Sequence, residues 1–361
     1  MLDLVNKILK IDTNENFISI DIGSGNIKIV SIISEDESLT VNAVATIPTP
    51  VSAISNNIIV EPELIAESIV TAMKNNNISE AKVVYSLPGP SVFTKKIKTS
   101  KISADDFKEN LSFEAASYVP HEMSSVKLDF QIISSDEQDM EVLLVAVKDE
   151  IIDSYKATIV ASGLVPAVAD VDYFAISNMY ELNYPEDENK LVAILDVGSK
   201  YTGVSLIKDK IPYFTGDIPV GGKLYTDAIM ESLGLEHSDA EQVKLGESQL
   251  EIDKALLADT LDRTTDYIAG EIHRQLGFFW TAAELETGIE KIYLCGGACV
   301  SHGLINELKE RTGIECEIVD PFKKINTGSN IDRDYLKQLS LFLSPSAGLG
   351  IRKIGDKVNA E

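Results

Sequence analysis

One strand–turn–strand pattern occurs twice in this chain of 361 residues. The first copy covers residues 17–30 and contains Asp21-Ile-Gly-Ser, and the second covers residues 191–207 and contains Asp196-Val-Gly-Ser. β-Branched residues that alternate around a glycine-containing turn indicate a β-hairpin. The two aspartates lie 175 positions apart, which is about the length of one domain. A repeat this long is not a solenoid, and it predicts two similar lobes folded around a central cleft.

The composition is that of a globular protein with a strong negative charge. Hydrophobic residues make up 44% of the chain, and the formal net charge is −25. This charge repels nucleic acid and anionic lipid headgroups, so we expect no nucleic-acid partner and no direct insertion into a membrane. A membrane role would have to act through a protein partner. No run of about 18 apolar residues is present, and the amphipathic stretch at residues 2–9 is too short and too weakly basic for a lipid anchor.

The start of the chain and the cysteines both indicate a reducing compartment. Residues 1–16 contain no apolar signal core followed by a small-residue cleavage site, so we expect a cytoplasmic protein. Cys295, Cys299 and Cys316 form an odd set without neighbouring histidines, which is poor spacing for zinc. We interpret them as reduced thiols in a core. Phe278, Phe279 and Trp280 are also interpreted as core residues.

Between the two hairpins lies a segment that reads as a small α+β insertion at residues 80–164. Its expected strands are residues 82–87, 126–133 and 141–148, and its expected helices begin at Ser103 and cover residues 150–161. Outside it, the pattern predicts helices at residues 61–74, over most of residues 225–274 and near Ser346, with a strand at residues 289–294. The insertion therefore interrupts the first lobe and leaves the second lobe continuous.

The two Asp-x-Gly-Ser turns suit the phosphates of a nucleotide held between the lobes. Glycine allows the backbone to approach anionic oxygens, and the N–H groups of the turn can then donate hydrogen bonds to them. Asp21 and Asp196 end their strands at the cleft floor, where carboxylates suit a magnesium ion that keeps most of its waters. The candidate phosphate-binding residues are Gly23, Ser24, Gly25, Asn26 and Lys28 in the first turn and Gly198, Ser199, Thr202 and Gly203 in the second.

Two further glycine pairs and two helical pairs extend this candidate site. Glycines that end a strand allow a purine and a ribose to lie against the chain, although such junctions also occur for packing reasons. Each helical pair is spaced i, i+3, and either one can equally be a solvated surface ion pair. The candidates are Gly221, Gly222 and Lys223 in one loop, Gly296, Gly297 and Ala298 in another, Glu241 with Lys244, and Glu271 with Arg274.

These segments, in this order, resemble the phosphate and adenosine loops of the actin, Hsp70 and sugar-kinase ATPase superfamily. Within that superfamily, nearly the whole chain is similar to PilM, a family of type IV pilus assembly proteins related to the division protein FtsA. Further segments that carry this likeness are Val84-Tyr-Ser-Leu-Pro88-Gly89, Phe113-Glu-Ala-Ala-Ser-Tyr118-Val-Pro120, Asp217-Ile-Pro-Val-Gly221-Gly222, Ala240-Glu241-x-x-Lys244 and Glu271-Ile-His-Arg274.

The resemblance implies an α/β fold with duplicated, ribonuclease H-like lobes around a nucleotide cleft and an inserted α+β subdomain of the FtsA type. The implied subdomains are 1A at residues 1–79, 165–190 and 343–361, 1C at residues 80–164, 2A at residues 191–221 and 286–342, and 2B at residues 222–285. It also implies ATP with Mg²⁺ in the cleft.

The resemblance further implies a scaffold at the inner face of the cell membrane. The implied partners are the cytoplasmic N-terminal tail of a PilN-like membrane protein, the pilus platform and its motor ATPases, with self-association as a further option. A groove beside the insertion would accept the tail, and its candidate residues are Phe113, Tyr118, Val119 and Pro120. The same residues can instead cover the core of the insertion, and both interpretations stay open.

Hydrolysis of ATP is less certain than binding. The superfamily uses a Gln, Glu or Asp to orient a water molecule, and here residues 168–175 are expected to form the connecting helix that carries it. Asp172 fits best, with Asp170 as the alternative, and helix capping is a competing role for either. Aspartate reaches one methylene less far than glutamate, so we expect slow turnover or none.

Two other functions are compatible with the same lobes. An FtsA-like filament protein would carry a C-terminal amphipathic membrane helix, and residues 358–361 follow the last expected helix too closely for one. Polymers formed with ATP would favour that function. A small-molecule kinase needs a catalytic aspartate aimed at a substrate hydroxyl, and none is evident in the sequence. ADP release that depends on a substrate would favour a kinase.

Overall fold

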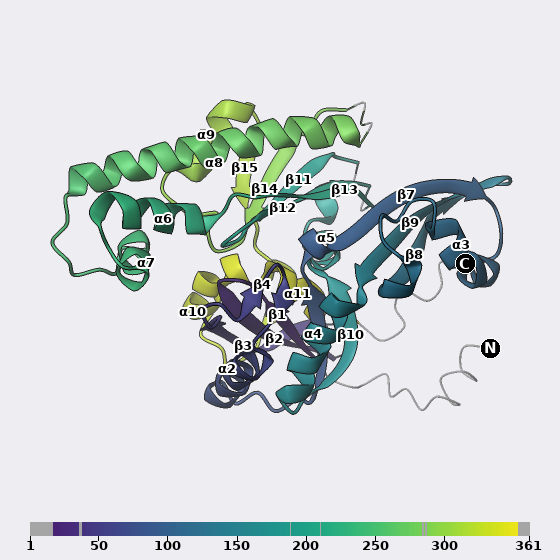
Figure 1. The fold of residues 1–361 in the computed structure, drawn as a ribbon, viewed down its shortest axis with the longest axis horizontal. Coiled ribbons are helices and arrows are strands. Elements are labelled where there is room, and N and C mark those ends of the chain that lie inside the picture. Colours follow the sequence, from purple (N-terminus) through teal and green to yellow (C-terminus); the bar gives the residue numbers. More distant parts are fainter. Residues whose placement is uncertain are drawn as a thin grey trace.

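The fold consists of two lobes that are each built on a β-sheet (Figure 1). The computed structural model describes residues 17–352, except residues 36–37, 188, 210, 284 and 286. The first sheet has the strand order β10-β6-β1-β2-β3-β16, and the second has the order β13-β12-β11-β14-β15. The strands of the first sheet are β1 (Ile18–Ile22), β2 (Asn26–Glu35), β3 (Ser38–Pro48), β6 (Lys82–Leu87), β10 (Val165–Val171) and β16 (Asn326–Thr327). Those of the second are β11 (Val192–Val197), β12 (Thr202–Lys208), β13 (Ile211–Ile218), β14 (Lys291–Cys295) and β15 (Glu315–Ile318).

The two expected hairpins are the matching centres of these sheets. β1 pairs antiparallel with β2 and parallel with β6, and β11 pairs antiparallel with β12 and parallel with β14. Asp21 and Asp196 therefore occupy equivalent places near the ends of β1 and β11. Most of the helices pack on the sheets, whereas α7 packs with α6 and α8 in a small core of its own. The helices outside the insertion are α2 (Pro62–Asn75), α4 (Asp149–Ala161), α5 (Asp172–Asn183), α6 (Gly222–Leu233), α7 (His237–Leu245), α8 (Lys254–Ala282), α9 (Leu304–Thr312), α10 (Arg333–Leu339) and α11 (Ser344–Gly350).

Each lobe has its own apolar core, and a third core lies between the lobes. In the first lobe, β1 and β6 pack with the apolar faces of α2 and α4. In the second lobe, β11, β12 and β14 pack with α8 and α9. The third core joins strands of both sheets through α5, and it includes Val30 of the first lobe, Ile176 and Tyr180 of α5, and Ile194 and Tyr293 of the second lobe. The two lobes therefore share buried surface at the closed side of the cleft.

The insertion is a three-stranded sheet with one helix, and it is smaller than expected. Its strands are β7 (Val92–Ser100), β8 (Val126–Ser135) and β9 (Asp139–Lys148), in the order β7-β9-β8, and α3 (Ala104–Ala115) covers one face. The expected boundaries at residues 80 and 164 do not match this unit. β6 belongs to the six-stranded sheet, and α4 buries Ile151 and Tyr155 in the core of the first lobe.

The insertion also contacts the second lobe. β7 and β13 are edge strands of their sheets, and the hydroxyl groups of Thr94 and Thr215 lie 3.2 Å apart. The Lys96 ammonium lies 4.8 Å from the centre of the Tyr213 ring. These side-chain contacts connect an insertion that is rooted in the first lobe to the outermost strand of the second.

Two further sequence predictions are decided by the described residues. The prediction of a helix at residues 168–175 is wrong for its first half. Residues 165–171 form strand β10, which pairs with β6, and α5 begins only at Asp172. The three cysteines are buried and form no disulfide, as predicted. The amphipathic stretch at residues 2–9 and the end at residues 353–361 lie outside the described residues. Among the helices of the described ranges, none has the length and apolarity needed to cross a membrane.

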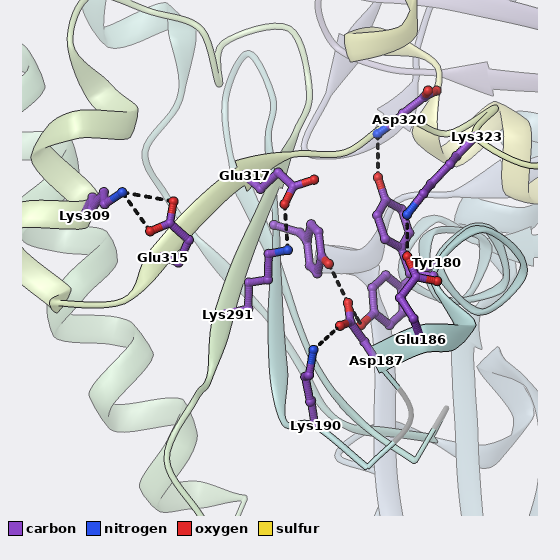
Figure 2. A network of polar contacts seen from close by, with 12 residues as sticks. Tyr180, Glu186, Asp187, Lys190, Lys291, Lys309, Glu315, Glu317, Asp320 and Lys323 are labelled. Atoms are coloured by element: carbon purple, nitrogen blue, oxygen red, sulfur yellow. Dashed lines mark hydrogen bonds and ion pairs between the residues drawn. The ribbon is translucent and has the colours of Figure 1, made fainter.

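A buried carboxylate fixes the chain where it passes from the first lobe to the second (Figure 2). Asp187 accepts hydrogen bonds from the hydroxyl groups of Tyr180 and Tyr293. It also forms an ion pair with Lys190, whose Nζ lies 2.6 Å from Oδ1. Burial alone would raise the pKa of Asp187, but Lys190 and the Tyr293 hydroxyl outweigh burial and lower it. The tyrosine rings of Tyr180, Tyr184 and Tyr293 pack on one another.

We expect Asp187→Ala to destabilise the chain by about 3 kcal/mol, because it leaves buried hydroxyls without their acceptor and removes the partner of Lys190. The lowered pKa of Asp187 means that its contribution is present above its unfolded pKa and is lost as the pH falls. Urea unfolding of both proteins at neutral and acidic pH measures this. An unchanged difference between the two proteins at acidic pH would contradict the role of the ionised carboxylate. Asp320→Ala, which keeps the Asp187 contacts, is the control.

Candidate functional site

The two predicted turns meet at the opening between the lobes. A Cβ atom at Gly25 would lie only 3.2 Å from the Ser199 Cβ, so the turns are in contact across the lobes. The first turn is held by backbone hydrogen bonds from Gly23 N to Asn26 O and from Thr49 N to Gly25 O. Ser24 is exposed at its tip. A side chain at residue 25 would separate the two turns, which explains glycine there.

The second turn lies against the N-terminus of α6. Gly222 N donates to Gly198 O at 2.9 Å, and Lys223 N donates to Ser199 O at 2.8 Å. A Cβ atom at Gly221 would lie 2.6 Å from both of these carbonyl oxygens, so the close approach itself requires glycine. The N-terminus of a helix favours anions through its N–H groups and its dipole. Because the N–H groups of Gly222 and Lys223 are used on the turn, α6 contributes its dipole to this place, which suits the charge of phosphate oxygens.

The third predicted loop lies beside the second turn. Ala298 N donates to Val197 O, and a Cβ atom at Gly222 would lie 3.0 Å from the Ala298 Cβ. Gly296 has φ +83°, a left-handed conformation that suits glycine, and a Cβ there would clash with Asp196 at 2.4 Å. The Phe342 ring packs against Gly297. Phe342 was not predicted for this loop, because its position far along the sequence gave no signal.

One of the two predicted helical pairs lies at this site and the other does not. Lys244 of α7 contacts Glu241 and the Thr226 hydroxyl, and its Nζ lies 3.5 Å from Gly222 O. Arg274 instead pairs with Glu271 on the exposed side of α8, with 65% of its side chain accessible. The Lys223 side chain also points to solvent, where it pairs with Asp227 at 2.6 Å. Only its backbone N–H contributes to the site.

The floor of the cleft combines carboxylates with one ammonium group. Lys28 Nζ lies 2.8 Å from Asp21 Oδ2, and the Ser86 hydroxyl donates to the other oxygen of Asp21 at 3.0 Å. Burial alone would lower the pKa of Lys28, but the Asp21 and Asp196 carboxylates outweigh it and raise the pKa. Burial raises the pKa of Asp196 to about 6, with Lys28 acting in the opposite direction. Lys28 therefore points at carboxylates in this state of the protein.

Asp172 and Asp217 add two more carboxylates to this floor. Burial raises the pKa of Asp172 well above its ordinary value, although Gly89 N–H donates to Oδ2 at 2.9 Å, and Asp217, Asp196 and Asp21 raise it further. Burial raises the pKa of Asp217 to about 6. Asp217 belongs to a segment that carries the family likeness, but it was not predicted as a site residue. Its register opposite Gly203 of the second hairpin is the signal that could have identified it.

Three other predicted residues have mainly structural contacts. The Thr202 hydroxyl is fully buried and donates to Val220 O at 2.9 Å, so it joins β12 to the loop before α6. Gly203 lies against the Tyr173 ring, where a Cβ would be 3.1 Å from the ring. Asp170 pairs with Arg352 at 3.1 Å, and its side chain is almost inaccessible. Asp172 is therefore the better placed of the two candidate aspartates.

The predicted groove residues of the insertion divide into two kinds. Val119 is buried in the core beneath α3, so for this residue the interpretation as core is the correct one. Phe113 is 82% exposed on the outer side of α3, and Tyr118 and Pro120 are exposed beyond the end of the helix. Phe113 and Tyr118 are accessible to a partner.

We expect Asp217→Asn to stabilise the protein without nucleotide by about 2 kcal/mol at neutral pH. The raised pKa means that the ionised carboxylate is disfavoured in the folded state, so its cost is fully present above about pH 6 and is relieved as the pH falls toward the ordinary value of 3.8. The gain should shrink across that interval in thermal or urea unfolding. Asp227→Asn, at an exposed ion pair, is the control. A gain that does not change with pH would contradict the burial of charge at Asp217.

Comparisons with known proteins are consistent with this geometry. A protein-family model described as type IV pilus assembly protein PilM matches residues 19–354. A solved PilM-PilN type IV pilus biogenesis complex is 23% identical, covers 94% of this chain and 98% of its own, and has a TM-score of 0.83. The ethanolamine utilization protein EutJ from Carboxydothermus hydrogenoformans is 13% identical, with coverage of 97% and 96% and a TM-score of 0.57.

A third solved structure, MreB 5 of Spiroplasma citri bound to AMPPNP, is 11% identical, with coverage of 96% and 97% and a TM-score of 0.52. At these identities the structural likenesses show a common fold, which is the actin-like ATPase fold predicted from the duplicated turns. The family model is more specific, because it matches nearly the whole chain. This protein therefore belongs to the PilM family of type IV pilus assembly proteins.

Proposed function

We propose that this chain is a scaffold of type IV pilus assembly that binds Mg²⁺-ATP between its lobes and the tail of a membrane-anchored partner at its insertion. The observation that carries the nucleotide part is the meeting of three backbone segments: the turn at Gly25, the turn at Ser199 and the N-terminus of α6. The N–H groups of Gly222 and Lys223 already donate to Gly198 O and Ser199 O, so α6 fixes the second turn and adds its dipole. The N–H groups at the tips of the two turns would bind the phosphates. The ends of both lobes would then contact the same phosphates.

The charges of the cleft favour magnesium nucleotide over free nucleotide. Asp21, Asp172 and Asp196 lie around Lys28, and Asp217 lies beside Asp172 and Asp196, so a bare triphosphate would meet more negative than positive charge. A divalent cation offsets both the carboxylates and the phosphates. In the described part of the chain, no group of three His, Cys, Asp or Glu side chains is arranged to hold a metal ion directly. Asp21 and Asp196 would therefore hold Mg²⁺ through its water molecules.

The adenosine end of the nucleotide would lie between α7 and the Gly296–Ala298 loop. Lys244 and Glu241 stand at the N-terminal end of α6 beside Gly222, within reach of a ribose or a base. Asp172 is the candidate for orienting a water molecule. Its two carboxylate oxygens already accept hydrogen bonds from the backbone N–H groups of Gly89 and Tyr173. Such a carboxylate is restrained from reaching toward a phosphate, and we propose tight binding with slow turnover or none.

Lys244→Ala should weaken the binding of Mg²⁺-ATP about tenfold, which corresponds to the loss of roughly 1.4 kcal/mol from one charged contact. Isothermal titration calorimetry measures the change directly. Lys223→Ala is the matched control, because Lys223 begins the same helix but its side chain pairs with Asp227 in solvent. If both variants weaken nucleotide binding equally, the effect comes from the overall positive charge of the region and not from the position of Lys244. No binding of Mg²⁺-ATP to the unaltered chain would refute the nucleotide part of the proposal.

The partner part of the proposal rests on the family and on the exposed aromatic residues of the insertion. The solved structure with a TM-score of 0.83 is described as a complex of PilM with PilN. In this chain, Phe113 is the most exposed aromatic side chain of the insertion. A short apolar peptide can bury such a ring, and aromatic anchors commonly dominate binding at interfaces. We propose that a PilN-like cytoplasmic tail docks there and holds the protein at the inner face of the membrane, close to the pilus platform and its motor ATPases.

An apolar cluster at the root of the insertion joins it to the first lobe. Val92, Leu143 and Val145 are partly buried on the face of the insertion sheet opposite α3, and they pack against Tyr173 and Phe174 of α5. Because α5 already covers this face, the exposed α3 side of the insertion is the part that is open to a peptide. Tyr173 and Phe174 directly follow Asp172 in α5, so the root of the insertion lies beside the nucleotide cleft.

We expect Phe113→Ala to weaken the binding of a labelled PilN-like tail peptide at least tenfold, because a large apolar contact is lost. Fluorescence anisotropy with and without Mg²⁺-ATP measures the affinity. Phe278→Ala removes another exposed ring, 64% accessible against 82% for Phe113, from α8, far from the insertion in the sequence, and should leave the affinity unchanged. If the two variants bind the peptide equally well, the tail does not use the α3 surface.

A further inference from the structure

The outer face of α8 carries a stripe of exposed arginine and aromatic side chains. α8 is a helix of 29 residues that lies along the second lobe (Figure 1). Arg263, Tyr267, Arg274 and Phe278 are 56–68% exposed. At 3.6 residues per turn, the four side chains lie within a sector of about 60° on one side of the helix. Phe278 was interpreted as a core residue from the sequence, and its exposure shows that this prediction was wrong.

The order of these residues is self-complementary. Arg263 and Phe278 lie at equal distances from the point between Gly270 and Glu271, and so do Tyr267 and Arg274. A second copy of α8, packed antiparallel about a two-fold axis at that point, would place Arg263 against Phe278 of the second copy. It would also place Tyr267 against Arg274. Both combinations are cation–π pairs, and the two-fold axis forms each of them twice.

We propose that two copies of this chain associate through the outer faces of α8, antiparallel and centred on Gly270. Gly270 has no side chain to hold the two helix backbones apart at the crossing point. Arginine and aromatic side chains are the types that are enriched at the energetic centres of protein interfaces. An isologous contact of this kind closes on itself, so it gives a dimer and not a filament.

Charge on the stripe is balanced locally, although the whole chain is strongly acidic. Arg263 pairs with Asp259 at 2.8 Å, and Arg274 pairs with Glu271 at 2.6 Å. The stripe therefore presents almost no net charge to its copy. The formal net charge of −25 still opposes the approach of two chains at long range. Salt screens that repulsion over a Debye length of about 8 Å at physiological ionic strength, so the dimer should become stronger as salt is added.

The first test is sedimentation equilibrium of the full chain over a range of protein and salt concentrations. A pair of helices buries less than the roughly 800 Å² per partner of a standard interface, so we expect weak, concentration-dependent dimers. Tyr267→Ala with Phe278→Ala should lower the association constant at least tenfold. Phe113→Ala, which removes a still more exposed ring from the insertion, should not change it. A chain that stays monomeric at every concentration, or a double variant that dimerises as before, overturns the proposal.

The second test fixes the geometry by cross-linking. Cys295, Cys299 and Cys316 are buried, so an added surface cysteine would be the reactive one. A Cβ atom at Gly270 would lie 3.4 Å from Arg311 Nη1, which is an ordinary contact, so a cysteine fits there. In the proposed dimer, Gly270→Cys places the two thiols near the axis. Thr281→Cys, on the same face of α8, places them roughly 30 Å apart at 1.5 Å per residue.

Mild oxidation should therefore link Gly270→Cys into a dimer much faster than Thr281→Cys. Equal rates would indicate random collisions and would overturn the proposed packing. Circular dichroism and thermal unfolding of both variants verify that the helix is intact. The sedimentation result with Tyr267→Ala and Phe278→Ala decides the question independently if Gly270→Cys fails to fold.

Discussion

Four buried carboxylates lie close together at the bottom of the cleft, and three of them surround the ammonium group of Lys28. These three are Asp21, Asp172 and Asp196, whereas Asp217 lies beside Asp172 and Asp196, and the four come from four different elements. Burial raises the pKa of both Asp196 and Asp217, and the neighbouring carboxylates raise it further. The apolar core shared by the two lobes lies behind this group and holds the lobes together. Buried groups with shifted pKa values cluster at functional sites, so this floor is the candidate for chemistry in the cleft.

The shared core and the buried Asp187 network join the two lobes at the closed side of the cleft. At the open side the lobes touch at the two turns and where the insertion meets β13. Tyr180 belongs to the first lobe's α5 and Tyr293 to the second lobe's β14, yet both donate to the same carboxylate. At the open side, Gly25 meets Ser199 without an interlobe hydrogen bond from either residue among the bonds of the described chain. The closed side is therefore the stronger of the two connections. Motion of one lobe against the other would be centred there.

The sequence predicted the duplicated hairpins, the actin-like fold and most of the backbone of the candidate site. These features are local, because glycines and strand patterns are read within a few residues. Contacts between distant segments were not accessible in the same way. Asp217, Phe342 and the β10 strand were missed or misassigned, since each depends on a neighbour far along the chain: Asp217 on the first lobe's α5, Phe342 on Gly297, and β10 on its pairing with β6.

Side-chain direction was the other limit of the sequence. Lys223, Arg274 and Phe278 have the residue types and spacing of site or core positions, but they face solvent. Which side of a helix is buried depends on the element that packs on it. α8 buries Ile268, Ile272 and Leu276 against the second sheet. Because these residues face the sheet, Arg274 on the other side of the helix faces solvent.

The contact between β7 and β13 has a consequence for solubility. An unpaired edge strand exposes backbone hydrogen-bonding groups that can recruit a strand from another molecule, and this is a common route to aggregation. Here two edges from different sheets lie beside each other through Thr94 and Thr215 and hinder access to each other. The Lys95, Lys96 and Lys98 side chains line the same stretch of β7, and lysine on an edge discourages further pairing. An insertion that enlarges the surface of the protein thus shields an edge that the second lobe would otherwise expose.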